Sequence, residues 1–274
     1  MKKISRRSFL AAAAVSAAAL ALTACGGASS SVASSVASSA AASSSASGSL
    51  ATVVAGKLTM ATNATFPPYE MTTDSGDIAG IDIDTAKAIA EKLGLELQVD
   101  DMEFDAALLS VQQGKADIVM AGVTVTDERK AVMDFSDSYA TGIQSIIVPE
   151  GSDITSPDDL AGKKIGTQRG TTGYIYCSDD FGDDAVVAYD DGLTAVQALK
   201  NGQVDAVVID NAPAKEYVAA NPGLVILDTS YAEEDYAIGM AKGSALEDAV
   251  NAALEELKAD GTLQSIVDKY ITAE

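Results

Sequence analysis

The sequence predicts an α/β protein of two similar lobes, each a mostly parallel sheet flanked by helices. From Lys57 onward, short apolar runs with strand character alternate with amphipathic helical segments, which is typical of parallel sheets. In addition, residues 108–119 resemble residues 196–207: both contain an amphipathic helix, a glycine, a short turn onto aspartate and a buried strand. A spacing of 88 residues that occurs only twice favours two lobes over a solenoid. Chance similarity between two αβ units is the alternative.

The N-terminal segment 1–24 is predicted to be a lipoprotein signal peptide. Basic residues precede an apolar stretch over 9–22, which is too short to span a bilayer. The tetrapeptide Leu22-Thr-Ala-Cys25 resembles a lipobox, which implies cleavage before Cys25 and lipidation of that cysteine. A plain secretory leader is the alternative. Because Ser5-Arg-Arg-Ser-Phe-Leu10 also fits a twin-arginine motif, two routes of export stay open.

Residues 25–50 combine the lipidated cysteine with a segment made mostly of Ser, Ala and Gly. Such a composition cannot bury a core and behaves as a flexible tether. A tether of this length places the folded region about 25–30 Å from its anchor. We therefore expect a protein that is attached to a membrane surface without spanning the membrane.

The first lobe is assigned from short apolar runs for strands and from apolar residues three and four apart for helices. The expected elements are strand 58–62, a Pro-rich loop to Tyr69, helix 84–93 ended by Gly94, strand 95–99, helix 104–113 and strand 117–121.

The second lobe is expected to start near the strand 143–148. The later elements are a short helix capped by Ser156 with Pro157 first, strand 164–167, a turn over 168–173, and amphipathic helices 246–257 and 263–271 separated by Gly261. The last two helices are expected to cover the first lobe. The predicted boundaries are 51–143 plus 235–274 for lobe 1 and 144–234 for lobe 2.

Composition excludes several classes of function. Without the four basic residues of the leader, 14 Lys and Arg face 40 Asp and Glu, a net charge of −26. This charge repels nucleic acid and anionic lipid, so we expect no nucleic-acid partner. The absence of histidine removes Ser–His and Cys–His catalysis and the commonest metal ligand, and no calcium loop is present. We therefore expect no catalytic residues, no metal and no cofactor.

The two cysteines also limit the possible chemistry of the chain. Once Cys25 is lipidated, Cys177 stands alone, so no disulfide can form within the chain. We interpret Cys177 as a buried or incidental residue, with a reactive thiol as the alternative.

The position of Arg129 is the best indication of function. After the leader the chain has only two arginines, Arg129 and Arg169. Thr126 is expected to cap a helix, which places Arg129 at the third helical position, where the helix dipole favours anions. An arginine beside free backbone N–H groups at a helix start predicts a carboxylate-binding site. A structural ion pair with Asp127 or Asp134 is the alternative.

Several segments together resemble one known family. They are Ala61-Thr-Asn-Ala-Thr-Phe-Pro-Pro-Tyr-Glu70, Gly80-Ile-Asp-Ile-Asp84, Met102-Glu-Phe-Asp105, residues 121–130, Asp134-Phe-Ser-Asp-Ser-Tyr139, Gly170-Thr-Thr-Gly173 and Val204-Asp-Ala-Val-Val-Ile-Asp210. From about residue 57 to 270, the chain resembles the polar amino-acid-binding proteins of ABC importers, extracytoplasmic solute-binding protein family 3.

This resemblance implies a type II periplasmic-binding-protein fold, with two hinge strands joining two lobes around an amino acid. The implied ligand-binding residues are Asn63, Phe66, Phe104, Gly122, Thr124, Arg129, Gln168, Thr172 and Asp210. Arg129 would bind the α-carboxylate with backbone groups of Thr124 and Thr172. The α-ammonium would contact Asp210, the Gly122 carbonyl and the Thr124 hydroxyl. Phe66 and Phe104 would enclose the side chain, and Asn63 would face its polar end.

The physical argument agrees with this implied site. A zwitterion needs one fixed cation and one fixed anion, and Arg129 and Asp210 each follow a predicted strand end. Because these two residues lie in different predicted lobes, one ligand would bridge both and favour closure.

Each assignment has a plainer alternative. Asp210 is also placed to cap the helix that begins at Asn211, and the two phenylalanines are also suited to ordinary packing. The turn 170–173 is alternatively a simple loop. Arg169 matches no family contact, and we interpret it as a solvated surface residue.

The type of ligand side chain is predicted from two positions at which this chain departs from the family pattern. Relatives that take Lys, Arg or His usually have a carboxylate where this chain has Asn63, and Ile209 is apolar where some relatives are polar. Asparagine cannot neutralise a cation but can bond an amide or hydroxyl. Both residues favour a polar, uncharged or modestly apolar amino acid, unless Glu70 or Asp105 supplies a charge.

The predicted function is the substrate-binding component of an ABC importer, which captures an amino acid and delivers it to a permease with its ATPase. The protein would be a monomer, not an enzyme, anchored through Cys25 at the extracytoplasmic face of the bacterial cell membrane. The alternatives are a dehydratase-like periplasmic enzyme on the same scaffold and a ligand-sensing partner of a signalling receptor.

Overall fold

The computed structural model describes residues 50–271 of the chain. The predicted signal peptide, Cys25 and nearly all of the predicted tether lie outside these residues, so they stay predictions. Within the described range, no helix is both long enough and apolar enough to cross a membrane.

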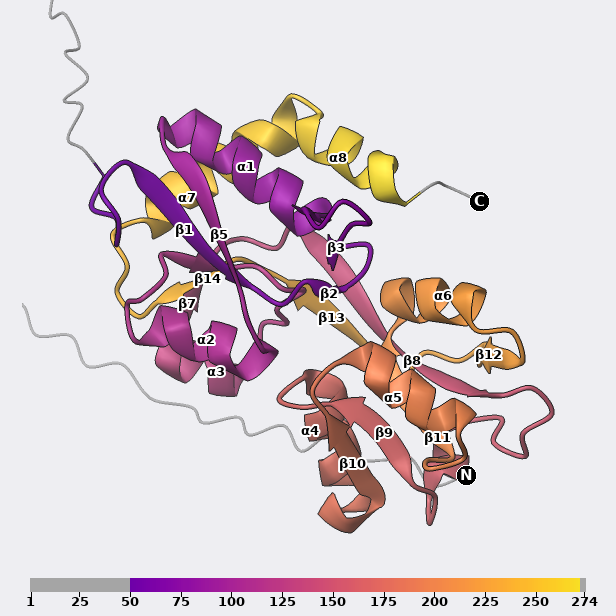
Figure 1. Cartoon of the computed structure of the whole chain (residues 1–274). Helices are drawn as coiled ribbons and strands as arrows, with labels where there is room; N and C mark the ends of the chain where they lie inside the picture. The colour runs from indigo at the N-terminus through magenta and orange to yellow at the C-terminus, as the bar shows by residue number, and fades with distance from the viewer. Residues whose placement is uncertain (1–49, 272–274) are drawn as a thin grey trace, which may run out of the picture. The chain divides into compact units, whose positions relative to one another are not determined.

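Two five-stranded paths with the same pattern of strand directions organise the fold (Figure 1). The first is β5 (Glu96–Asp101), β1 (Lys57–Thr62), β6 (Ile118–Val119), β14 (Gly239–Ala241) and β7 (Met133–Phe135). The second is β10 (Val186–Tyr189), β9 (Ile165–Gln168), β11 (Ala206–Asp210), β8 (Ala140–Pro149) and β12 (Leu224–Ile226). In each path the first three strands are parallel and the last two pair antiparallel. The predicted two-lobed α/β fold is confirmed.

Helices flank both sheets. The first lobe carries α1 (Ile81–Leu93), α2 (Phe104–Gln112), α3 (Asp127–Val132), α7 (Glu247–Ala259) and α8 (Thr262–Tyr270). A small sheet of β2 (Thr65–Phe66), β3 (Glu70–Thr72) and β4 (Ile78–Ala79) lies beside α1. The second lobe carries η1 (Pro157–Leu160), α4 (Thr172–Phe181), η2 (Asp183–Ala185), α5 (Gly192–Lys200) and α6 (Asn211–Ala220). Helices α7 and α8 pack against α1, next to the first sheet.

Two antiparallel strands connect the lobes. Strand β8 pairs with β13 (Ala232–Tyr236), with Gln144 opposite Ala232 and Ala140 opposite Tyr236. The two strands run side by side between the sheets (Figure 1). The predicted lobe boundaries after residues 143 and 234 fall inside these strands, and the boundaries themselves stay a prediction.

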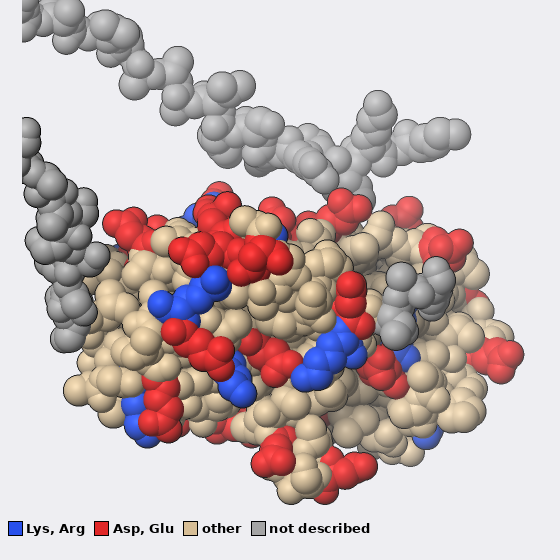
Figure 2. All heavy atoms as spheres, turned by 90° about the horizontal axis from the view of Figure 1, so that it is seen from above, with Lys and Arg blue, Asp and Glu red and all other residues tan. Residues whose placement is uncertain are grey.

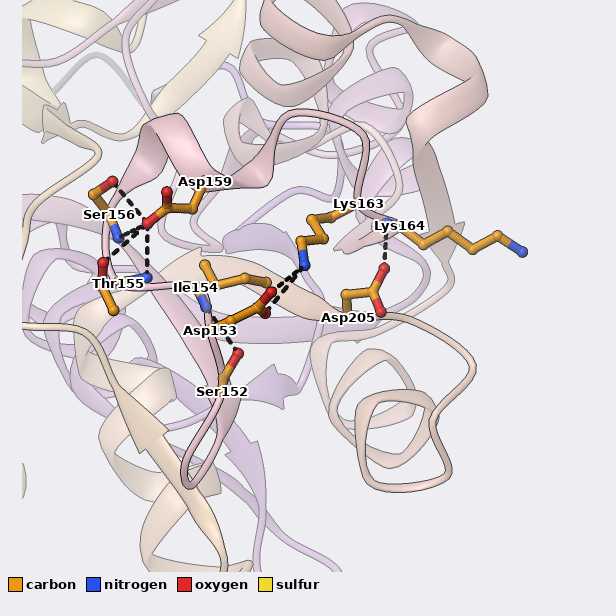
Figure 3. Close-up of polar contacts among 9 residues, drawn as sticks. All are labelled: Ser152, Asp153, Ile154, Thr155, Ser156, Asp159, Lys163, Lys164 and Asp205. Carbon is orange, nitrogen blue, oxygen red and sulfur yellow. Dashed lines mark hydrogen bonds and ion pairs between the residues drawn. The ribbon is translucent and has the colours of Figure 1, made fainter.

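The repeated sequence corresponds to a repeated structural device. After α2, Asp117 Oδ2 accepts a hydrogen bond of 2.8 Å from the backbone N–H of Thr59 in β1. After α5, Asp205 Oδ2 accepts a hydrogen bond of 2.8 Å from the backbone N–H of Lys164, just before β9 (Figure 3). In both lobes the aspartate therefore ties the turn after a helix to the neighbouring parallel strand.

The start of η1 is fixed by a capping box, which confirms the cap predicted at Ser156. Asp159 Oδ2 accepts hydrogen bonds of 3.0 Å from the backbone N–H groups of Thr155 and Ser156 (Figure 3). Close by, Lys163 pairs with Asp153 at 3.0 Å (Figure 3). This polar cluster is exposed and lies outside the cavity described below.

Helix α1 begins at Ile81, three residues before the predicted start. Gly80 precedes it with a φ of 142°, and a Cβ there would lie 2.0 Å from the carbonyl oxygen of Tyr69. The turn therefore requires glycine, and no capping side chain marks the helix start. Ile81 and Ile83 are buried, so the first helical turn contributes to the core.

The surface agrees with the acidic composition. Asp and Glu side chains spread over the face shown in Figure 2, with Lys and Arg among them. The formal net charge of the whole chain is −22. Apolar side chains fill the interior on both sides of the connecting strands.

Candidate functional site

A small cavity brings together all nine residues that the resemblance implied. It is lined by Asn63, Phe66, Glu70, Phe104, Ala121, Gly122, Thr124, Arg129, Gln168, Thr171, Thr172 and Asp210. Because these residues come from both sheets, the cavity lies between the two lobes.

Arg129 is a buried cation that makes no ion pair within residues 50–271. It is 8% exposed, and its Nη1 and Nη2 atoms donate to the carbonyl oxygens of Thr124 (2.8 Å) and Gly170 (3.1 Å). Burial lowers the pKa of Arg129. The alternative pairs with Asp127 and Asp134 do not form. A desolvated guanidinium of this kind is normally matched by an anion.

The helix geometry at Arg129 is as predicted. Thr126 caps α3, and its hydroxyl accepts the N–H of Arg129 at 3.2 Å. The guanidinium carbon lies 5.4 Å from the centre of the Phe104 ring. The aromatic ring and two carbonyls therefore hold the cation in one orientation.

Asp210 is a buried acid on the opposite lobe, at the end of β11. Its Oδ2 accepts a hydrogen bond of 2.8 Å from Gln144 Nε2, and its Oδ1 accepts one from the Tyr236 hydroxyl. Burial raises the pKa of Asp210 to about 7, although both hydrogen bonds favour the charged form. The side chain makes no capping bond to α6, so the capping alternative is not what the structure shows.

Asn63 and Gln168 meet across the two lobes. Gln168 Nε2 donates to Asn63 Oδ1 at 2.8 Å, while Asn63 Nδ2 donates to the carbonyl oxygen of Met102 at 2.9 Å. The amide of Asn63 is therefore oriented, with its oxygen toward Gln168 and its nitrogen toward the first lobe.

Two further contacts shape the wall formed by the first lobe. Gly122 has a φ of 55°, and its Cβ, if present, would lie 2.9 Å from the Phe66 ring, which explains the glycine. The backbone N–H of Gly122 donates to Asp82 Oδ2 at 3.0 Å, and the Tyr139 hydroxyl donates to Asp82 Oδ1 at 2.8 Å. Asp82 thus fixes the backbone of a cavity residue, a role that the sequence analysis missed.

Glu70 lines the cavity, although the sequence did not predict its position. It is fully buried, and neither carboxyl oxygen has a hydrogen-bond partner among the described residues. Burial, followed by the nearby charge of Asp82, raises the pKa of Glu70 well above its usual value. Asp105, the other acid in question, does not line the cavity; its carboxylate lies against Gly170 instead.

Arg169 and Cys177 have no place in the cavity. The Arg169 side chain is 56% exposed and lies 3.5 Å from Asp190, which confirms the surface interpretation. Cys177 is fully buried, and burial raises the pKa of its thiol to about 12, so it is not a reactive thiolate.

The comparisons with known proteins identify the family. Residues 58–273 match the bacterial extracellular solute-binding proteins, family 3. The chain belongs to this family. Its members are solute-binding proteins rather than enzymes, and the family name places them outside the cytoplasm.

Relatives within family 3 are similar over most of their length. The chain is 34% identical to the probable histidine-binding protein of Neisseria gonorrhoeae, over 96% of this chain and 95% of that protein. A solved structure of an ancestral arginine-binding protein bound to glutamine is 43% identical, with a TM-score of 0.76 and coverage of 80% and 100%. A structure of an ancestral arginine-binding protein bound to arginine is 44% identical, with a TM-score of 0.75 and coverage of 79% and 98%.

The described part of this family 3 chain offers no metal centre. Within residues 50–271, no group of three or more His, Cys, Asp or Glu side chains is placed to hold a metal ion. The chemistry available in the cavity is that of one cation, acidic groups, amides, hydroxyls and aromatic faces.

Proposed function

We propose that this protein captures an amino acid between its two lobes and delivers it to the permease of an ABC importer. The observation that carries the proposal is Arg129, a buried cation that lacks an ion pair in residues 50–271 and shares a small cavity with the buried acid Asp210. A free amino acid supplies the missing anion and a cation together.

The two poles of the cavity match the two charges of an α-amino acid. The α-carboxylate pairs with Arg129 beside the backbone of Thr172, the first residue of α4, whose N-terminal N–H groups suit an anion. The α-ammonium lies toward Asp210, with the Gly122 carbonyl and the Thr124 hydroxyl as further acceptors. The names of relatives that bind histidine, arginine or glutamine support an amino acid as the ligand.

The far end of the cavity carries amide groups that can both donate hydrogen bonds to a ligand and accept them from it. The Asn63 oxygen already accepts from Gln168 Nε2 and Thr65 Oγ1, so the second N–H of Asn63 and the amide oxygen of Gln168 are the groups that remain for a ligand. A polar, uncharged side chain such as that of glutamine fits this set, with Phe66 and Phe104 against its methylene groups.

One observation favours a cationic side chain as a second candidate. Glu70 is buried at the cavity without a hydrogen-bond partner among the described residues, and burial, followed by the charge of Asp82, raises its pKa. A guanidinium or ammonium group within reach of Glu70 would allow it to ionise. Arginine is the representative ligand of this candidate.

The remaining parts of the proposal concern where the protein works. The sequence motifs support removal of residues 1–24, lipidation of Cys25 and display of a monomer on the outer face of the cell membrane. A tether over residues 25–50 would give the binding domain freedom to reach a permease.

Thermal unfolding of the full chain with each of the twenty amino acids tests the proposal. A ligand at 100 times its Kd adds about 2.7 kcal/mol of stability, which shows as a clear rise in Tm. Arg129→Met should lose at least about 100-fold in affinity, because it removes a buried charged partner. The matched control, Arg169→Met, removes an exposed arginine and should bind normally. An unchanged Tm with all twenty amino acids would refute the proposal, as would full affinity in Arg129→Met.

Glu70→Gln separates the two ligand candidates. The substitution keeps the size of the side chain and removes its ability to ionise. If arginine is the ligand, affinity should fall at least about tenfold; if glutamine is the ligand, it should change by less than about threefold. Titration calorimetry with both amino acids gives both values.

A further inference from the structure

A buried acid outside the cavity contacts the groups that are proposed to receive the α-ammonium. We infer that Glu234 is a positioning residue for this ammonium, acting through the Thr124 hydroxyl. The inference rests on the proposed function and adds to it a residue that touches no ligand.

Glu234 lies on β13, one of the two strands that connect the lobes, and is 6% exposed. Its Oε2 atom accepts two hydrogen bonds, from Gln144 Nε2 at 2.9 Å and from Thr124 Oγ1 at 3.1 Å. Glu234 is not among the residues that line the cavity, whereas Thr124 is. The carboxylate therefore stands behind the wall of the site.

The hydrogen bond from Thr124 to Glu234 determines whether the Thr124 hydroxyl donates to a ligand or accepts from it. A threonine hydroxyl has one proton to donate and lone pairs to accept with. Since Glu234 takes the proton, the oxygen of Thr124 is left as an acceptor. An ammonium group has only donors, so an acceptor oxygen is what it needs.

Without Glu234, another orientation of this hydroxyl is available. Thr172 Oγ1 lies 3.4 Å from Thr124 Oγ1, within reach as an alternative acceptor for the proton. Glu234 is the stronger acceptor because it is a carboxylate. It thereby holds Thr124 in a single hydrogen-bonding state before a ligand arrives.

Glu234 is also linked to the acid on the opposite lobe. Gln144 Nε2 donates to Glu234 and, at 2.8 Å, to Asp210 Oδ2, so one amide serves both carboxylates. The charge of Glu234 contributes to raising the pKa of Asp210 and opposes the lowering of the pKa of Arg129. The negative field on the ammonium side of the cavity thus comes from two acids.

A double-mutant cycle of Glu234→Gln and Thr124→Val tests the inference. Each single variant of the full chain should weaken binding by about tenfold, measured with L-glutamine or L-arginine, whichever raises the Tm of the wild type more. If Glu234 acts through the Thr124 hydroxyl, the double variant should bind about as weakly as Thr124→Val alone. If the two residues act independently, their losses of affinity should instead multiply to about 100-fold.

Glu233→Gln is the matched control, since it makes the same change at the exposed neighbouring position of β13. It should bind like the wild type. Glu234→Asp keeps the charge but shortens the side chain, so it provides a second variant if Glu234→Gln does not fold; it should also lose affinity, and none of that loss should remain in a Thr124→Val background.

Two results would overturn the inference: affinity within twofold of wild type in both Glu234 variants, or losses that multiply with that of Thr124→Val. Failure of the proposed function looks different, because then the wild-type chain itself binds no amino acid. A change in the Tm of the ligand-free chain alone would indicate a structural role for Glu234 and would also count against the inference.

Discussion

Asp210 is the residue at which protonation and the proposed ligand binding are coupled. Burial raises its pKa to about 7, while two hydrogen bonds favour its ionised form. An ammonium group beside it would favour the ionised form further. Ligand binding in this site is therefore linked to proton release.

The linkage predicts the pH dependence of affinity. Below pH 7 the ligand-free carboxyl holds a proton that an incoming ammonium must displace, so affinity should rise with pH. We expect the Kd to fall by up to about tenfold per pH unit between about pH 5.5 and 7, and to change little from about pH 7.5 to 8.5. Calorimetry in two buffers of different ionisation heat measures the released proton directly.

The ligand-free chain should show the opposite trend in stability. Because the pKa of Asp210 is raised above about 3.9, its usual value in an unfolded chain, the folded state holds the extra proton between about pH 4 and 7. The contribution of Asp210 to the free energy of unfolding therefore falls as pH rises through this window.

An affinity that is constant from pH 5.5 to 8 would contradict the assignment of Asp210 to the ammonium.

The sequence predicted the cavity residues better than the residues that support them. All nine residues implied by family resemblance line one cavity, where strand ends, helix starts and the loops between them come together. Asp82 was missed because it lies two residues from Asp84, and the local sequence pattern distinguishes neither acid. Only the contact between Asp82 and Gly122, 40 positions away, sets the fully buried acid apart from its half-buried neighbour. Glu234 was missed for the same reason beside Glu233.

At the scale of elements, Asp117 and Asp205 serve the same role with different surroundings. Asp117 is buried and accepts 2.8 Å hydrogen bonds from the N–H groups of Val53 and Thr59. Asp205 is exposed and accepts one such bond, from Lys164. The energetic cost of losing the carboxylate should differ accordingly.

We therefore expect Asp117→Ala to lower the free energy of unfolding by about 2–4 kcal/mol, because two backbone donors lose a charged partner in a buried setting. Asp205→Ala should cost about 1 kcal/mol or less, since water can replace its single exposed bond. Urea unfolding of the two variants gives the comparison. Equal losses of unfolding free energy would show that burial does not determine the cost of removing the carboxylate. The affinity for amino acids should stay unchanged in both variants.

Many elements were predicted in type and order, while the element ends and several elements, such as α4, β7, β10 and β12, were not. The start of α1 was missed because a glycine turn, rather than a capping side chain, precedes it. The predicted strand at 117–121 is only Ile118–Val119 in the structure. Strands β13 and β14 were not predicted, since the acidic run Glu233-Glu-Asp235 hides the alternation that places Glu234 and Tyr236 inside.

For the whole molecule, the decisive contacts are those that join the lobes directly. The Tyr217 hydroxyl on α6 donates to the carbonyl oxygen of Thr65 in β2, next to Phe66. Gln168 to Asn63 and Arg129 to Gly170 are further bonds across the cleft. These bonds form only when the lobes are closed, so they add to the stability of the closed state.

Removing one of them should shorten the lifetime of the bound complex. We expect Tyr217→Phe to raise the Kd about fivefold through faster dissociation, which corresponds to a hydrogen bond of about 1 kcal/mol. Stopped-flow tyrosine fluorescence measures the rates. Tyr231→Phe is the control, because its hydroxyl bonds to Asp180 within one lobe; it should leave dissociation unchanged. Equal dissociation rates in wild type and Tyr217→Phe would exclude a role for this contact in closure.

The path of the chain between the lobes has a consequence for how the protein acquires its structure. In the first sheet, β14 lies between β6 and β7, although it is the last strand of the chain. The second lobe, by contrast, draws all its strands from residues 140–236. The second lobe can therefore be completed once residues up to 236 are available, whereas the first lobe also needs β14. The cleft, which needs both lobes, is complete only after residues 239–241 have joined the first sheet.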